Sequence, residues 1–71
     1  DTLGIAYSMV NIGNLDHFQS NFYKAVNSYS NALNLIVKDT SRNALSLRKA
    51  IYDNLSVSYD SLKDYKKAFV N

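Results

Sequence analysis

The amino-acid sequence predicts an all-α fold of antiparallel helical hairpins, and three observations carry that prediction. Apolar residues recur every three or four positions along most of the 71 residues, which is the period of a helix with one buried face. The chain has no proline and only two glycines, so it lacks the turn formers from which β-sandwiches and barrels are built. Its composition, 46% apolar and 20% charged, is that of a folded domain.

The first predicted helix spans residues 3–19 and is apolar on more than one side. One stripe contains Leu3, Ala6, Tyr7 and Val10, and a second contains Ile5, Met9 and Ile12. Because two stripes point in different directions, we expect this helix to contact neighbours on two sides.

The second predicted helix spans residues 22–38 and has a single apolar face, with polar residues opposite. Asn21 stands immediately before it as a candidate N-cap. The residues expected to be buried are Phe22, Ala25, Val26, Tyr29, Ala32, Leu33 and Ile36.

Two further helices are predicted, over residues 42–62 and 65–71. Thr40 or Ser41 can cap the third, and Asp64 the fourth, after a short turn at Ser61–Lys63. Apolar residues at helical spacing in the third are Ala44, Leu47, Ala50, Ile51, Leu55, Tyr59 and Leu62.

The sequence matches itself at an offset of 43 residues. Asn11-Ile12-Gly13 falls on Asn54-Leu55-Ser56, Asn21-Phe22 on Asp64-Tyr65, and Lys24-Ala25 on Lys67-Ala68. Small residues such as Ala25 and Ala68 let paired helices approach closely. A helical hairpin repeated at such a period is typical of a solenoid.

This pattern resembles the tetratricopeptide repeat (TPR) family, whose unit is a helix–turn–helix of about 34 residues. The residues that match are Met9, Ile12, Gly13, Phe22, Ala25, Tyr29 and Ala32 in one copy, and Tyr52, Leu55, Tyr59, Asp64, Tyr65 and Ala68 in the other. Asp16 departs from the pattern, which usually has tyrosine there. The long spacing is similar to that of repeats in bacterial sensor and regulatory proteins. The resemblance implies one TPR-like domain over residues 1–71, with repeat one at about 3–38 and an incomplete repeat two at about 42–71.

In this family, partners bind a concave groove lined by the first helix of each hairpin. The resemblance places eight residues there: Val10, Asn11, Asn14, His17, Asp53, Asn54, Val57 and Asp60. Asn11 and Asn54 are the pair implied to hold a peptide backbone or a terminal carboxylate. Val10 and Asp53 stand where chaperone-binding members have basic residues, so a neutral or weakly basic segment suits this groove better than an acidic tail. That these are simply solvated polar positions is an equal alternative.

Other classes of function are disfavoured by the residues present. There is no cysteine, and His17 is the only histidine, so no catalytic constellation, metal site or cofactor site is expected. Lys63, Lys66 and Lys67 form the only basic cluster, and the net charge is only +2, which argues against nucleic-acid binding. No apolar run exceeds three residues, so no membrane contact by this segment is expected.

We therefore expect a non-enzymatic protein–protein interaction module, part of a larger regulatory or scaffold protein, that binds a protein or peptide. The alternatives are a sensory input domain of a bacterial two-component kinase or transcription regulator, and a purely structural spacer. A domain this small should also leave Ile51, Leu55 or Tyr59 partly open, which would permit self-association through the repeat-two face. No targeting segment is recognisable, and the sequence favours neither the cytoplasm nor the periplasm.

Overall fold

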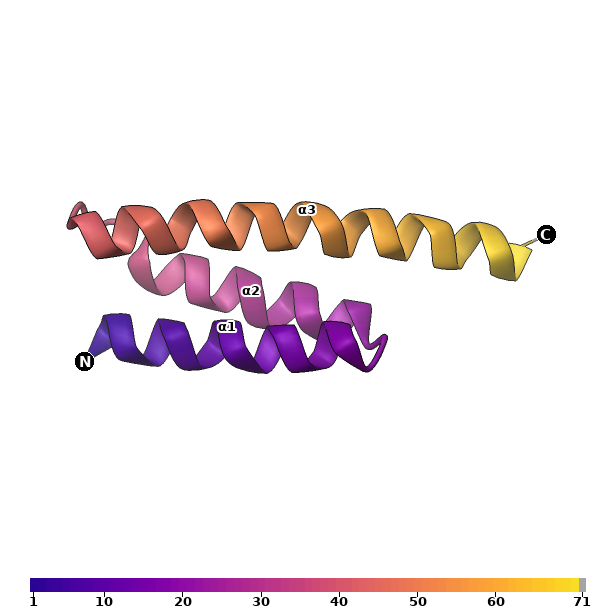
Figure 1. The fold of residues 1–71 in the computed structure, drawn as a ribbon, viewed down its shortest axis with the longest axis horizontal. Helices are drawn as coiled ribbons and strands as arrows, with labels where there is room; N and C mark the ends of the chain where they lie inside the picture. Colours follow the sequence, from indigo (N-terminus) through magenta and orange to yellow (C-terminus); the bar gives the residue numbers. More distant parts are fainter. Residues whose placement is uncertain (71) are drawn as a thin grey trace.

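The computed structural model describes the backbone of residues 1–70 and the side chains of residues 1–64. Over that part of the chain it contains three helices, α1 (Thr2–Phe18), α2 (Phe22–Ile36) and α3 (Arg42–Val70), and no strand. The helices α1 and α2 form an antiparallel hairpin, and α3 runs antiparallel to α2 and continues past the end of the hairpin (Figure 1). The predicted all-helical class is confirmed.

The turn between α1 and α2 is a Schellman motif, in which two backbone hydrogen bonds close the end of a helix. The Asn21 N–H donates to the Asp16 carbonyl at 2.8 Å, and the Ser20 N–H to the His17 carbonyl at 2.9 Å. Ser20 adopts the left-handed conformation that this motif requires, with φ 63°. The turn therefore lies where the sequence predicts it. Asn21 occupies the N-cap position of α2, although its side chain makes no capping hydrogen bond.

The loop before α3 is ordered by two side chains that bond to the backbone. The Ser41 hydroxyl accepts from the Ala44 N–H at 3.3 Å, so Ser41 is the predicted cap. The Ser41 N–H donates to the Asp39 carboxylate at 2.9 Å. Hydrogen bonds from the Ser41 backbone, and then from its side chain, lower the pKa of Asp39. The ionised carboxylate therefore favours this turn above the ordinary carboxyl pKa, and the contribution is lost as the pH falls through the lowered value.

Arg48 ties α3 to the end of α2. Its Nη2 donates to the carbonyl of Val37 at 2.7 Å, with longer contacts to the carbonyls of Ile36 (3.4 Å) and Asp39 (3.5 Å). Carbonyls at the end of a helix have no partner within the helix, and a cation there also complements the helix dipole. Arg48 thus completes the C-terminus of α2 from the next helix.

The core lies along the two contacts that α2 makes with its neighbours. Gly13 of α1 faces Tyr29 so closely that a Cβ at this position would lie 2.7 Å from the ring. Ala25 and Ala32 are fully buried, which agrees with the close helix approach that the sequence predicts. The buried hydrophobic residues are Ala6, Val10, Ala25, Tyr29, Ala32, Ile36, Ala44, Leu47, Ile51, Leu55 and Leu62.

The predicted turn at Ser61–Lys63, with Asp64 capping a separate fourth helix, is wrong. The single helix α3 runs without interruption from Arg42 to Val70. The segment contains neither glycine nor proline to end a helix. Moreover, Leu55, Ser58 and Leu62 are buried at helical spacing, so packing of α3 continues up to the predicted turn. Burial of Ala68 lies outside the side chains that the structure describes.

Burial differs from the prediction at several other positions. The second stripe of α1 is largely open, because Ile5 and Ile12 are exposed and α1 packs mainly against α2. On α3, Ala50 is exposed, whereas Ser58 is buried although the sequence does not predict it in the core. Of the three residues among which the sequence predicts an exposed one, Tyr59 is exposed, and Ile51 and Leu55 are buried.

Candidate functional site

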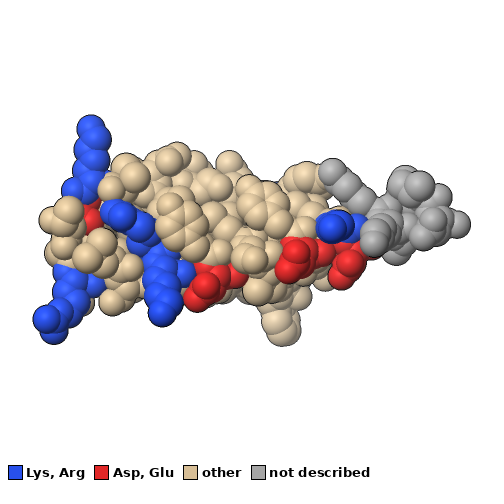
Figure 2. Space-filling model, turned by 90° about the horizontal axis from the view of Figure 1, so that it is seen from above, with Lys and Arg blue, Asp and Glu red and all other residues tan. Residues whose placement is uncertain are grey.

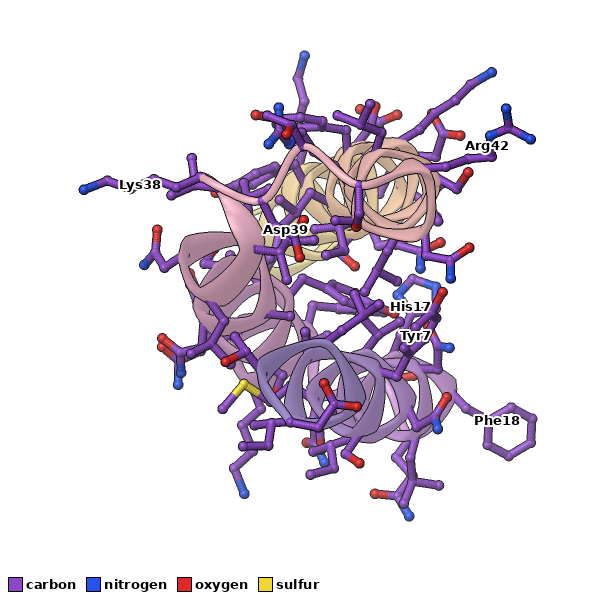
Figure 3. The ribbon with its side chains drawn as sticks, turned by 90° about the vertical axis from the view of Figure 1, so that its left-hand side faces the viewer. Tyr7, His17, Phe18, Lys38, Asp39 and Arg42 are labelled. Carbon is purple, nitrogen blue, oxygen red and sulfur yellow. The ribbon has the colours of Figure 1, made fainter. Side chains whose placement is uncertain are left out.

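A groove lies between α1 and α3, with α2 behind it. Tyr7 and His17 point from α1 into the space below α3, and Phe18 projects outward (Figure 3). Near the end of α1, the groove contains a pocket of about 280 Å³. Its lining comes from all three helices: Asn14, His17, Phe18, Tyr29, Asn54 and Val57. The lining is mainly apolar and contains no Lys, Arg, Asp or Glu.

One side-chain oxygen joins the three helices at this pocket. Oδ1 of Asn14, on α1, accepts a short hydrogen bond from the Tyr29 hydroxyl of α2. The same oxygen accepts from Nδ2 of Asn54 on α3, at 3.4 Å. Each helix thus contributes one polar group to a shared network, which fixes the two asparagines relative to each other.

A second link between α1 and α3 lies beside the first. Nδ1 of His17 is 3.3 Å from the hydroxyl of Ser58, which is fully buried. The His17 ring also meets the edge of Phe22, with ring centroids 5.2 Å apart and planes at 61°. The hydrogen bond supplies the partner that a buried hydroxyl needs, and the ring contact holds the imidazole in place. His17 therefore lines the pocket and also links α1 to α3 through Ser58.

The asparagine pair still has unused hydrogen-bonding groups. Within the described part of the chain, Nδ2 of Asn14 and Oδ1 of Asn54 have no protein partner. An asparagine side chain offers two N–H donors and one carbonyl acceptor. The pocket therefore presents a donor and an acceptor close together, which complement the C=O and N–H of an amide group.

Tyr29 forms the floor of the pocket and is almost completely buried. Burial raises the pKa of its hydroxyl, and the nearby Asp16 carboxylate raises it further. Because the folded-state pKa is the higher one, the Tyr29 hydroxyl stabilises the fold fully below the ordinary tyrosine pKa of about 10. That contribution is lost as the pH rises through the raised value.

We expect Tyr29 to ionise above the ordinary tyrosine pKa. The measurement is the pH titration of tyrosinate absorbance in the intact protein minus that of the Tyr29→Phe variant, since the difference isolates one of the six tyrosines. A difference curve with its midpoint at or below about 10 would contradict the buried, hydrogen-bonded hydroxyl.

The structure brings together four of the eight groove residues that the sequence suggests. Asn14, His17, Asn54 and Val57 line the pocket. Val10 instead is buried and belongs to the core. Asn11, Asp53 and Asp60 are exposed and lie outside the lining. Asn14 rather than Asn11 is the residue that meets Asn54.

Two lining residues were not among the candidates. Helical spacing predicts Tyr29 in the core, where it lies, but nothing in that spacing shows that its hydroxyl reaches the groove. Phe18 is 86% exposed, far more than any other large hydrophobic residue among the described side chains. Its place one residue after His17, at the end of α1, was the available signal.

The described residues contain no group of three or more His, Cys, Asp or Glu placed to hold a metal ion. In the same part of the chain, no helix combines the length and the apolar character needed to cross a membrane. The sequence has no significant match among family models, curated proteins or solved structures.

Proposed function

We propose that the chain is a TPR-like protein–protein interaction module that binds a peptide segment in the groove between α1 and α3. The observation that carries the proposal is the meeting of Asn14 and Asn54, from separate helices, in a pocket without charged side chains. Their free donor and acceptor suit the main chain of an extended peptide. The exposed rings and methyl groups of Phe18 and Val57 offer contacts to an apolar peptide side chain.

The packing of the hairpin supports the TPR part of the proposal. Gly13 and Tyr29 hold positions of the family pattern, and they are in direct contact across α1 and α2. Leu55, which matches Ile12 in the repeat, is buried where α3 packs on the preceding hairpin, whereas Ile12 lies on the outer side of that hairpin. This is the relation expected between successive units of a stacked array. The uninterrupted α3 means that the proposal rests on one hairpin and one further helix.

The test begins with a library of random peptides displayed on phage and selected on the immobilised protein. The affinity of a selected peptide, labelled with a fluorophore, is then measured by anisotropy for the native chain and for single variants. We expect Asn14→Ala and Asn54→Ala each to weaken binding roughly tenfold, since each removes one hydrogen bond to the peptide.

Matched controls come from neighbouring exposed residues on the same helices. Asn11→Ala on α1 and Asp53→Ala on α3 should bind as the native chain does, because neither residue lines the pocket. Circular dichroism of all four variants checks that each keeps its helicity. Failure of the library to yield any binder would contradict the proposal, as would binding that Asn14→Ala and Asn54→Ala leave unchanged.

A further inference from the structure

A second exposed surface runs along α3, away from the groove. Leu45, Tyr52 and Tyr59 are spaced seven residues apart and therefore lie in one line along the helix. All three are about half exposed, at 48%, 54% and 54%. We call these three residues the α3 stripe. Lines of large apolar side chains, and tyrosines in particular, are typical of interaction surfaces.

The α3 stripe and the groove occupy different sides of the helix. Tyr52 is two residues from Asn54, and a helix turns by about 100° per residue, so their side chains project in nearly opposite directions. Asn54 lines the groove pocket, and the α3 stripe does not contribute to it. Binding at one surface therefore leaves the other free.

Charge along α3 is divided about the middle of the stripe. Residues 42–51 contain Arg42, Arg48 and Lys49 and no acid, whereas residues 53–62 contain Asp53 and Asp60 and no base. Figure 2, which looks down on α3, shows basic side chains gathered toward the end where α3 begins and mostly acidic ones following along it, with one further basic side chain near the grey region. Lys63 is the base that follows Asp60 in the described part of α3. Such a helix face is complementary to a second copy of itself in the antiparallel direction.

We propose that the α3 stripe is a self-association surface at which two copies of the chain pair through antiparallel α3 helices about a two-fold axis at Tyr52. Each residue then lies level with the one equally distant from Tyr52 in the second copy. Tyr52 meets Tyr52, and Leu45 meets Tyr59 on both sides of the axis. A contact of this kind uses the same patch on both copies, as most homodimers do.

The charges favour this direction over the parallel one. In the antiparallel pair, Arg42 comes close to Asp60 of the second copy, and Lys49 close to Asp53 of the second copy. All four residues lie on the same flank of the α3 stripe by helical position. In a parallel pair, this flank would lie on opposite sides of the pair in the two copies, so Arg42 and Lys49 would not face Asp53 or Asp60 of the second copy. The surface is small, so we expect a weak dimer that forms with rising concentration.

Sedimentation velocity over a range of protein concentrations tests whether the dimer exists. We expect the native chain to shift from monomer to dimer, and Tyr52→Ser to remain monomeric at every concentration. Tyr7→Ser, which changes an exposed tyrosine of α1, should associate like the native chain. A native chain that is monomeric at its highest soluble concentration would overturn the proposal. Association that Tyr52→Ser does not weaken would overturn it as well.

Cross-linking tests the direction, because the natural chain has no cysteine. Lys49→Cys and Ser56→Cys introduce thiols beside the α3 stripe while leaving its three residues in place. In the antiparallel pair, position 49 is level with position 55 of the second copy and therefore close to position 56, so a mixture of the two variants should yield a cross-linked dimer under mild oxidation. Each variant alone should yield little cross-linked dimer. Efficient cross-linking of each variant with itself would indicate parallel helices and contradict the proposed arrangement.

Discussion

Replacing Gly13 by alanine should destabilise the protein by about 1–2 kcal/mol net, although alanine is the better helix former. The added methyl group would lie 2.7 Å and 2.8 Å from Cε1 and Cδ1 of the Tyr29 ring, closer than carbon atoms approach. Tyr29 is buried between helices, so its ring cannot move aside without disturbing the packing of α1 on α2. The helix-propensity gain of roughly 1 kcal/mol is smaller than this overpacking cost.

Gly4→Ala is the matched control on the same helix. Its added Cβ would lie 3.1 Å from Oδ2 of Asp1, the end of a flexible and exposed side chain that can move away. We expect this variant to be more stable than the native chain by about 0.5–1 kcal/mol. Urea denaturation followed by circular dichroism compares the two. If Gly13→Ala also raised the denaturation midpoint, that result would contradict the close contact described between Gly13 of α1 and Tyr29 of α2.

A double-mutant cycle tests whether the Tyr29 ring causes the destabilisation by Gly13→Ala. In a Tyr29→Leu background, the ring that the added methyl group would meet is gone, so Gly13→Ala should cost much less than in the native background. An unchanged cost would show that Gly13 is required for another reason.

Replacing Ile51 by alanine should cost about 2–5 kcal/mol, the largest loss we expect from a single substitution in this chain. Ile51 is fully buried where α3 packs against the hairpin. A domain of this size is stabilised by only about 5 kcal/mol in total. The variant should therefore be largely unfolded, or unfold at a much lower urea concentration than the native chain.

Ile12→Ala provides the comparison, because it makes the same chemical change at a helical position that is 55% exposed. Its helix-propensity effect is the same, so the difference between the two variants reports burial alone. We expect Ile12→Ala to cost less than about 1 kcal/mol. Equal losses would mean that α3 does not pack on α2 as described.

Much of the fold follows from local sequence. The single apolar face of α2, the turn at Ser20 and the cap at Ser41 all depend on spacing and residue type within a few positions. The continuity of α3 does not, because Ser61–Asp64 is a mostly polar segment of the kind that often ends a helix. Leu62 is buried and lies near Ser20 and Asn21, in the turn between α1 and α2. This burial favours a continuous α3, and it depends on the position of the hairpin.

The candidate site was predictable only in part, for a similar reason. Helical spacing places Asn14 and His17 on one side of α1, and the repeat match suggests Asn54 and Val57 on α3. Which asparagine of α1 meets Asn54 depends on the rotation of α1, which is set by the Gly13–Tyr29 contact. Spacing within α1 alone could not separate Asn11 from Asn14. The same contact brings the Tyr29 hydroxyl into the groove.

The central claim, that the groove between α1 and α3 is the binding surface, is tested most directly by nuclear magnetic resonance of the ¹⁵N-labelled protein. A peptide selected from the random library is added, and the side-chain amide signals of the nine asparagines are followed. We predict the largest shifts at Asn14 and Asn54, with Asn27, Asn31 and Asn34 on the polar face of α2 unaffected. Shifts confined to α2, or to backbone amides around Ile5 and Ile12, would place binding elsewhere and contradict the account.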